Sequence, residues 1–320
     1  MAASQLLRLC VAFTMLTNGC IFGQDTNLPG EFGPHLWTAT VKVVGEDGNP
    51  IAGADAAVQY SIIPVPSDPN QPRYGEIKGT TDTEGMFSAS HTDSSYDLGV
   101  VIDKAGYYAT QTGWQFYYDD KRRNPSFTLV LKKNGKPIAM YAKWVNENPP
   151  VLGQPIGYDL MVGDWVCDGH KGISRDIVFQ KWAYRKSGAD YEYKVKVAFP
   201  KDGDGIQIYT MPESEAGSGL RSPHEAPLDG YQPELNKERS AHPGQSPKND
   251  SDPNRIYLFR VRTAKDHEGN IVSAHYGKIY GDFMQFTYYL NPTSNDRNIE
   301  FDPKQNLLGG LQSFEQVDAP

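Results

Sequence analysis

The sequence predicts an all-β protein built from two antiparallel β-sandwich domains. Gly, Pro and Tyr are abundant, and apolar residues recur in short alternating runs with no long helical periodicity, a pattern typical of all-β chains. The chain has 320 residues, more than one core of ordinary size requires, so two domains are expected. We place the first sandwich, which is Ig-like, at residues 37–133 and the second at residues 156–308. A jelly roll is one architecture that the second domain could adopt.

Glycine-containing turns divide the first domain into strands. Asp47-Gly48 lies in the first turn, Gly85 in the second and Gly106 in the third. Glycine tolerates the positive φ that a tight reversal needs, and an aspartate side chain can accept a hydrogen bond from its own backbone. The strands predicted around these turns are residues 38–44, 98–102 and 127–133.

The order and spacing of these turns resemble the carboxypeptidase regulatory-like (transthyretin-like) domain. Residues 37–133 contain Gly-x-Pro-Ile-x-Gly-Ala, then Thr-Asp-x-x-Gly-x-Phe, then Lys-x-Gly-Tyr. The resemblance implies a β-sandwich that is usually appended to other domains and usually lacks catalytic residues. The residues that match these motifs are Gly48, Pro50, Ile51, Gly53, Ala54, Thr81, Asp82, Gly85, Phe87, Lys104, Gly106 and Tyr107.

Two features of the first domain depart from that family. Ala56 stands where the family usually has a β-branched residue, so we expect the second strand to begin at Val58. Residues 61–76 contain four prolines, which predicts an extended loop.

The N-terminus predicts export. Residues 6–16 are apolar, carry one basic residue (Arg8) and are too short to span a bilayer, which fits a secretory signal at residues 1–23. Cleavage would leave Gln24 first, followed by an N-terminal arm at residues 24–36. The competing hypothesis is a lipid anchor at Cys20, although the residues before it match a lipoprotein signal poorly. We therefore expect a secreted, periplasmic or cell-envelope protein with no transmembrane segment.

Charge and cysteine content exclude several classes of partner and bond. The formal net charge of −8 provides no electrostatic footprint for nucleic acid. Once the signal is removed, Cys167 is the remaining cysteine, so an intrachain disulfide is not expected.

The second domain is predicted to follow a linker at residues 134–155, where Pro149-Pro150 stiffens the chain. Residues 138–143 could instead form a last strand of the first domain. Residues 191–199 alternate cleanly, and the turn at 200–205 predicts a hairpin with 206–209. Further strands and a turn are predicted at residues 175–184, 255–263, 271–276, 283–290 and 266–270.

Two parts of the second domain are predicted to stay outside its core. Residues 213–254 are rich in Pro, Ser, Gly and charge, and they have too few apolar residues to offset the entropy of ordering. We predict that they leave the sandwich as a mobile excursion, with early proteolysis. Residues 309–320 are predicted to be a loose tail.

Catalytic and metal-binding patterns are weak. The sequence contains no His-x-x-Glu, Gly-x-Ser-x-Gly or Walker loop, and no cofactor is predicted. Asp164, Asp168 and His170 are weak candidates for metal ligands, and a Cys167–His170 nucleophile is less favoured still. The run from Asp202 to Gly205 fits a turn better than a calcium loop.

Aromatic residues are the better candidates for binding. Both faces of the strand at 114–118 would be aromatic, so at least one ring is expected to face solvent, where it could contact a partner. The candidate binding residues are Trp114, Phe116, Tyr117 and Tyr118. Glycan-binding surfaces use exposed aromatic rings, but every sandwich core uses such rings as well, and this alternative applies to a second group of rings at Trp182, Tyr184, Tyr191 and Tyr193.

The sequence therefore favours an exported, non-catalytic scaffold, adhesion or binding module whose partner is an envelope or extracellular protein or a polysaccharide. The alternative is a carbohydrate-active or other hydrolytic enzyme with its site in the second domain. Convergence of two carboxylates, or of a His/Asp set, in a pocket of that domain would favour the enzyme.

Overall fold

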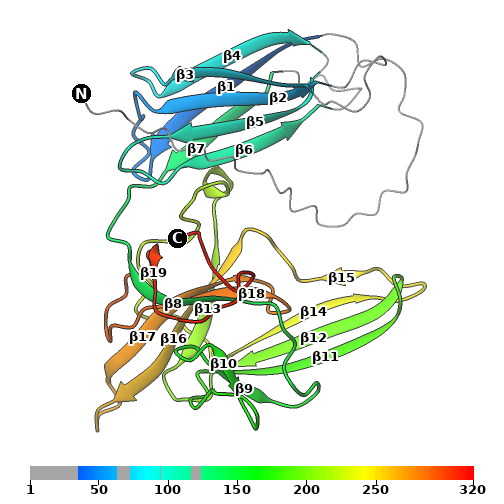
Figure 1. Cartoon of the computed structure of the whole chain (residues 1–320), viewed down its shortest axis with the longest axis vertical. Coiled ribbons are helices and arrows are strands. Elements are labelled where there is room, and N and C mark those ends of the chain that lie inside the picture. The colour runs from blue at the N-terminus through cyan, green and yellow to red at the C-terminus, as the bar shows by residue number, and fades with distance from the viewer. Residues whose placement is uncertain (1–34, 63–72, 94, 117–123) are drawn as a thin grey trace.

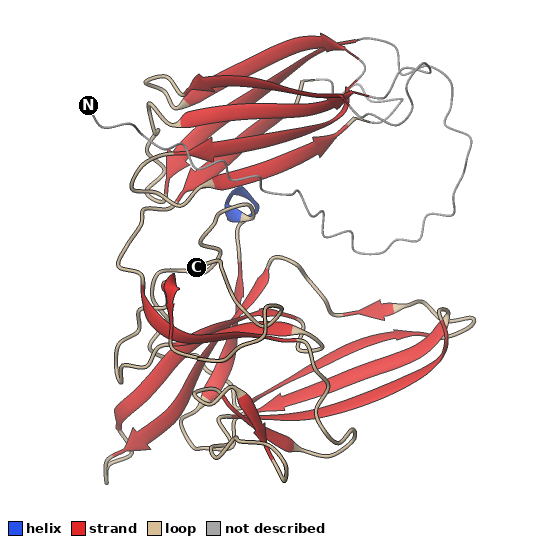
Figure 2. Cartoon of the chain, viewed as in Figure 1, coloured by secondary structure: helices blue, strands red, loops and turns tan. Residues whose placement is uncertain are grey.

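The computed structural model describes residues 35–62, 73–93, 95–116 and 124–320, and in these residues the chain is all-β apart from one turn of 3-10 helix (Figures 1 and 2). In the same residues no helix is long and apolar enough to cross a bilayer. The elements are β1 (His35–Gly45), β2 (Asp55–Ile62), β3 (Arg73–Thr80), β4 (Met86–Asp93), β5 (Ser95–Asp103), β6 (Thr110–Gln115), β7 (Ser126–Leu131), β8 (Ile138–Val145), β9 (Ile156–Asp159), β10 (Asp164–Val166), β11 (Ile177–Ser187), β12 (Asp190–Ala198), β13 (Gly205–Thr210), η1 (Glu213–Glu215), β14 (Glu234–Ala241), β15 (Lys248–Asn249), β16 (Arg255–Lys265), β17 (Ile271–Gly281), β18 (Phe286–Leu290) and β19 (Phe301–Asn306).

The first sandwich packs the sheet β4-β1-β7 against the sheet β3-β2-β5-β6. Strand β1 alternates as predicted, which directs Trp37, Val41 and Val43 into the core, where they are fully buried. Val58 and Val100 meet them from the other sheet. Most strand pairs are antiparallel, and β1 pairs in parallel with β7. The fold-class prediction is confirmed for this domain.

The predicted turns form by the expected chemistry. Gly48 and Gly85 have φ of 77° and 72°. The Asp47 carboxylate accepts a hydrogen bond from the Asn49 amide at 3.0 Å, and that of Asp82 accepts from the Met86 amide at 2.8 Å. These two turns carry the chain from one sheet to the other, because β1 and β2 lie in different sheets, as do β3 and β4.

The second strand and the Pro-rich loop differ from their predicted bounds. Strand β2 begins at Asp55, and Ala56 is buried in the core, where a small side chain fits between the sheets. Strand β3 occupies the last part of the predicted loop, and residues 63–72 lie outside the described residues.

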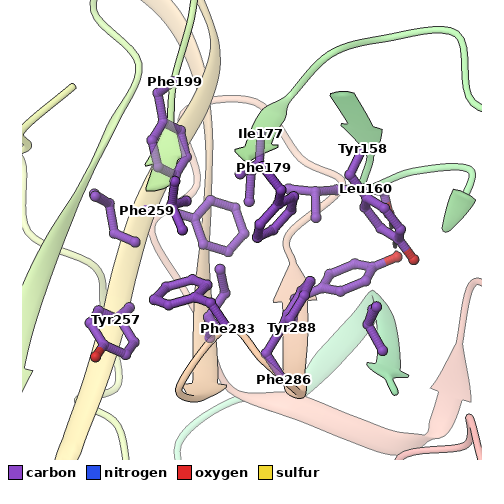
Figure 3. Close-up of a cluster of buried hydrophobic side chains, with 14 of the residues drawn as sticks. Tyr158, Leu160, Ile177, Phe179, Phe199, Tyr257, Phe259, Phe283, Phe286 and Tyr288 are labelled. Carbon is purple, nitrogen blue, oxygen red and sulfur yellow. Dashed lines mark hydrogen bonds between the residues drawn. The ribbon is translucent and has the colours of Figure 1, made fainter. Parts of the chain in front are cut away.

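The second sandwich packs two six-stranded sheets, β10-β9-β11-β12-β14-β15 and β13-β16-β17-β18-β8-β19. Aromatic side chains from both sheets fill its core (Figure 3). The rings of Phe179 on β11 and Phe286 on β18 stack with centroids 5.2 Å apart, and Tyr158 meets Phe179 edge-on. Such pairs add stability beyond the area that they bury.

The domain boundary differs from the predicted linker and tail. Strand β8 lies inside the predicted linker and is a member of the second sandwich, between β18 and β19. The C-terminal residues pack across the same strand: the Trp144 amide donates to the Glu315 carbonyl at 2.9 Å, and Lys143 forms an ion pair with Glu315 at 2.8 Å. The predictions of a linker at 134–155 and of a loose tail at 309–320 are therefore wrong.

The predicted excursion at 213–254 is also part of the fold. Strand β14 pairs with β12 along its full length, and Leu220 is fully buried. Composition misled the prediction, because the apolar stem of Lys237 is buried and its Nζ lies 6.0 Å from the centre of the Tyr257 ring. The hairpin predicted at 200–205 is wrong as well, since β12 and β13 belong to different sheets.

Candidate functional site: the interdomain junction

The segment that follows β13 leaves the second sandwich and lies against β6 and β7 of the first (Figure 1). The Gln111 amide donates to the Gly217 carbonyl at 3.0 Å, and the Gly219 amide donates to the Ala109 carbonyl at 2.8 Å. Backbone of the second domain thus pairs with the edge strand of the first, and it covers an edge that would otherwise be open. We call this contact, with the side chains around it, the junction.

A buried ion pair lies beside this backbone pairing. Lys132, at the end of β7, is 2% exposed, and its Nζ lies 2.7 Å from Oε2 of Glu215 in η1. The same Nζ donates to the Ser222 carbonyl at 3.1 Å. A buried lysine without its carboxylate would keep an uncompensated charge, so each domain depends on the other here.

A histidine joins carboxylates of both domains. His224 Nδ1 lies 2.5 Å from Oε1 of Glu300, and its Nε2 lies 3.1 Å from Oε1 of Glu46 in the first domain. Only an imidazolium can donate from both ring nitrogens. The hydrogen bond to Glu300 raises the pKa of His224, against the opposing effect of burial, and the contact with Glu46 raises it further.

Glu300 is the centre of this network. Its Oε2 accepts a hydrogen bond from the Tyr108 hydroxyl at 2.6 Å and from the Gly135 amide at 3.0 Å. Burial opposes ionisation of Glu300, but the hydrogen bonds from His224 and Tyr108 outweigh it and lower its pKa. Glu300, which precedes β19, thus connects three other parts of the chain. These are the loop before β6 in the first sandwich (Tyr108), the connection between β7 and β8 (Gly135) and the segment after β13 (His224).

A second lysine is fully buried near the same segment. Lys278 Nζ lies 3.0 Å from Ser222 Oγ, and 4.8 Å and 5.4 Å from the ring centres of Tyr289 and Tyr280. Burial lowers the pKa of Lys278 to about 7. Ser222 therefore contacts both buried lysines, one through its carbonyl and the other through its hydroxyl.

The junction residues escaped sequence reasoning because they are far apart in the chain. Tyr108 and Glu300 are 192 residues apart, and His224 and Glu46 are 178 apart. One local signal existed: the alternation of β17 puts Lys278 on the same strand face as Tyr276 and Tyr280, which is a buried face.

Carboxylates do converge within the second domain, at Asp159 and Asp176. Arg262 lies between them, with Nη2 at 2.9 Å from Asp159 and Nε at 2.8 Å from Asp176, and it adopts a φ of 57°. Asp159 also accepts from the amides of Met161 and Ser174. These charge-assisted hydrogen bonds hold the β9, β11 and β16 ends together.

The predicted metal ligands are only partly brought together. His170 Nδ1 lies 2.8 Å from Asp164, whose carboxylate also accepts from the Lys171 amide, and Asp168 is exposed. Within the part of the chain that is described, no three His, Cys, Asp or Glu side chains are grouped as metal ligands. The His170 ring bonds Asp164, and Cys167 packs against the aromatic core.

The predicted aromatic binding residues are divided. Phe116 is buried in the first core, and Trp114 is half-buried with its ring centroid 6.3 Å from that of Phe127. Phe116 is therefore not an exposed binding residue, because it fills the space between the two sheets. Tyr117 and Tyr118 lie outside the described residues.

Comparisons with known proteins assign no family. No family model and no curated protein matches this chain. Among solved structures, 3-chlorocatechol 1,2-dioxygenase from Rhodococcus opacus 1CP is similar over 33% of this chain, at 15% identity and a TM-score of 0.25. The 9R-lipoxygenase from Cyanothece PCC8801 is similar over 30%, at 15% identity and a TM-score of 0.20.

The shaft pilin spaA from Lactobacillus rhamnosus GG is similar over 73% of this chain and 89% of the pilin, at 10% identity and a TM-score of 0.23. By contrast, this chain spans 62% of the dioxygenase and 16% of the lipoxygenase. With TM-scores this low, none of these similarities assigns a function to the chain.

Proposed function

We propose that the chain is an exported, non-catalytic β-sandwich protein that acts as a scaffold, adhesion or binding module for a protein or glycan of the envelope or extracellular space. The observation that supports this most directly is the junction. Paired backbone and the buried Lys132–Glu215 ion pair join the two sandwiches, and we expect them to hold the sandwiches as one body, which suits a part that holds or presents a surface. A flexible linker would leave the domains free to move relative to one another.

The chemistry of the acidic clusters supports a non-catalytic module over the alternative, an enzyme with its site in the second domain. A general acid or base needs to reach the proton that it transfers. Asp159 and Asp176 are buried and bonded to Arg262, while Glu300 is buried and bonded to Tyr108 and His224. Each carboxylate therefore stabilises the fold through these hydrogen bonds and is not placed to exchange a proton with a substrate.

The leader and the first domain support the same proposal. The apolar residues 6–16 are typical of a secretory signal. The resemblance of residues 37–133 to the carboxypeptidase regulatory-like domain stays a prediction, and it favours an accessory module.

The proposal is tested on the full chain in its host. Secreted, envelope and cytoplasmic fractions are compared with an antibody raised against the purified protein, and the N-terminus is determined. We expect an exported chain that begins near Gln24, and crosslinking in that fraction should capture the partner. A cytoplasmic chain that retains Met1, or turnover of a polysaccharide or peptide by the purified protein, would contradict the proposal. A diacylglyceryl mass on Cys20 would identify the anchored version.

A further inference from the structure

One sheet of the second sandwich extends beyond the sheet that it packs against. Strands β11, β12 and β14 project away from the rest of the domain, with β15 along their edge (Figure 1). The burial of β11 changes along its length, as this projection requires. From Ile177 to Lys181 buried and partly buried residues alternate, and every residue from Trp182 to Ser187 is exposed. We call residues 182–194 and 238–249 the sheet extension.

Strand register defines what one face of the sheet extension presents. Trp182 pairs with Lys194, which pairs with Glu238 on the next strand. Cross-strand partners share a face, so these three side chains form one row across the sheet. A second row on the same face contains Tyr184, Glu192, Ser240 and Lys248.

Each row begins with an exposed aromatic ring. Trp182 is 41% exposed and Tyr184 is 49% exposed. Two positions along one strand are about 7 Å apart, so the rings form a short apolar strip. Gly153 lies beside the Trp182 indole, and the neighbouring Val151 and Leu152 are exposed as well.

A polar groove of about 260 Å³ lies next to this strip. Ser240, which is 4% exposed, donates to Glu238 at 3.0 Å. The Tyr184 hydroxyl lies 3.5 Å from Asp190, whose carboxylate also contacts His242 Nδ1 at 2.9 Å. The groove is lined by Glu192, Lys194, Glu238, Ser240, Ala241, His242, Gln245, Ser246 and Lys248.

The charges of the groove cancel internally. Lys194 forms an ion pair with Glu192 at 2.7 Å, and Lys248 lies 3.5 Å from Glu238. The groove therefore has hydrogen-bond donors and acceptors without an excess of either sign. An ionic ligand gains little here, and a nucleic acid or anionic polymer would meet as many acids as bases.

We propose that this face of the sheet extension binds a neutral oligosaccharide. A pyranose ring has an apolar C–H face and a rim of hydroxyl groups, and the extension offers both matching surfaces: aromatic rings for the faces and paired polar side chains for the rim. This inference rests on the proposed function, since it names the chemistry of the partner that such a module would hold.

The test uses the full chain, with maltohexaose, cellohexaose and chitohexaose as neutral probes and a hexapeptide of Gly and Ser as a polar control. Binding is measured by calorimetry, at probe concentrations up to about 10 mM, above the roughly millimolar dissociation constant that a few such contacts support. We expect at least one oligosaccharide to bind and Trp182→Ala or Tyr184→Ala to weaken it roughly tenfold, the loss expected for one ring contact. Ile173→Ala, which removes an exposed apolar side chain elsewhere, should leave binding unchanged.

Three results would overturn the inference: no oligosaccharide bound, equal binding by the ring variants, or stronger binding of the peptide than of any sugar. The fold of each variant is checked by its unfolding midpoint, and Tyr184→Phe, which keeps the ring, should bind more tightly than Tyr184→Ala. These failures are separable from failure of the proposed function, because none of these residues lies in the junction. A chain that is exported and moves as one body but binds no sugar would contradict the proposed oligosaccharide binding and leave the proposed function standing.

Discussion

Removal of one partner of the Lys132–Glu215 pair should destabilise the protein strongly and unequally. The two charges lie 2.7 Å apart, and their side chains are 3% and 17% exposed. Glu215→Gln leaves the lysine charge buried, which costs about 3–5 kcal/mol. Lys132→Met leaves Glu215 Oε2 buried without its partner, but the Glu215 side chain as a whole is the more exposed of the two, so we expect a smaller cost, of about 1–3 kcal/mol.

The double variant distinguishes the pair from its parts. Lys132→Met combined with Glu215→Leu removes both charges, and it should recover most of the stability, because replacement of a buried ion pair by apolar side chains is often close to neutral. Glu215→Leu alone is measured as well, so that the cycle closes, and with single losses of this size and a nearly neutral double variant the coupling energy between the two sites should be at least about 3 kcal/mol. The free energy of unfolding is measured by urea denaturation, with tryptophan fluorescence as the probe, since Trp37 reports on the first core and Trp165 on the second. Single variants that each change stability by less than about 1 kcal/mol would refute the reasoning, since surface pairs behave that way.

Three further predictions follow from the same contacts. Gly217→Ala should separate the unfolding of the two domains, because a Cβ there would overlap the Gln111 carbonyl oxygen, whereas Gly309→Ala, with open space around it, should match the wild type in differential scanning calorimetry. The pKa of Lys278 falls from 10.5 in the unfolded chain to about 7 in the folded one. Between these pH values the unfolded state binds more protons, so the free energy of unfolding rises with pH across that window by roughly 3–5 kcal/mol. Lys278→Met should remove this rise, and an unchanged pH profile of the unfolding free energy would refute it. Limited trypsin digestion should cut after Lys248 before it cuts after Arg221. Lys248 lies among exposed residues, whereas the Arg221 guanidinium lies 5.3 Å from the centre of the Tyr280 ring and donates to the Pro253 carbonyl. Earlier cleavage after Arg221 would instead support the sequence-based prediction that the segment around Arg221 is mobile.

Strand positions were predictable because alternation is a local property. Residues 191–199 show this: Val195, Val197 and Phe199 face the core, as their period of two requires. The turns at Gly48 and Gly85 were equally visible, since only the local backbone decides where a positive φ is needed.

Sheet membership was not predictable, because it depends on packing between distant segments. Nothing local to Asp202-Gly203 distinguishes a hairpin from a crossover to the other sheet, which is what the turn forms. Strand β14 has few apolar residues, and it is held by its pairing with β12 rather than by a hydrophobic face of its own. The low apolar content of residues 213–254 therefore predicted disorder where the structure has a strand and an interdomain tie.

The junction was invisible for the same reason. Its charged residues look like ordinary surface residues in the sequence, and burial becomes evident only when Lys132 and Glu215 meet from different domains. The candidate binding rings were chosen because both faces of the strand at 114–118 would be aromatic. Phe116 is buried in the core of the first sandwich, whereas Trp182 and Tyr184 are exposed on the sheet extension.

Amide nitrogen relaxation of the full chain tests the central claim most directly, because it measures whether the two sandwiches tumble together. The paired backbone at Gly217 and the contacts of Lys132 and His224 predict one rotational correlation time for amides of β1–β7 and of β8–β19. The Gly217→Ala variant should lower the value for the first sandwich. A shorter correlation time for the first sandwich already in the wild-type chain would contradict the account, since it would mean that the junction does not hold the domains together in solution.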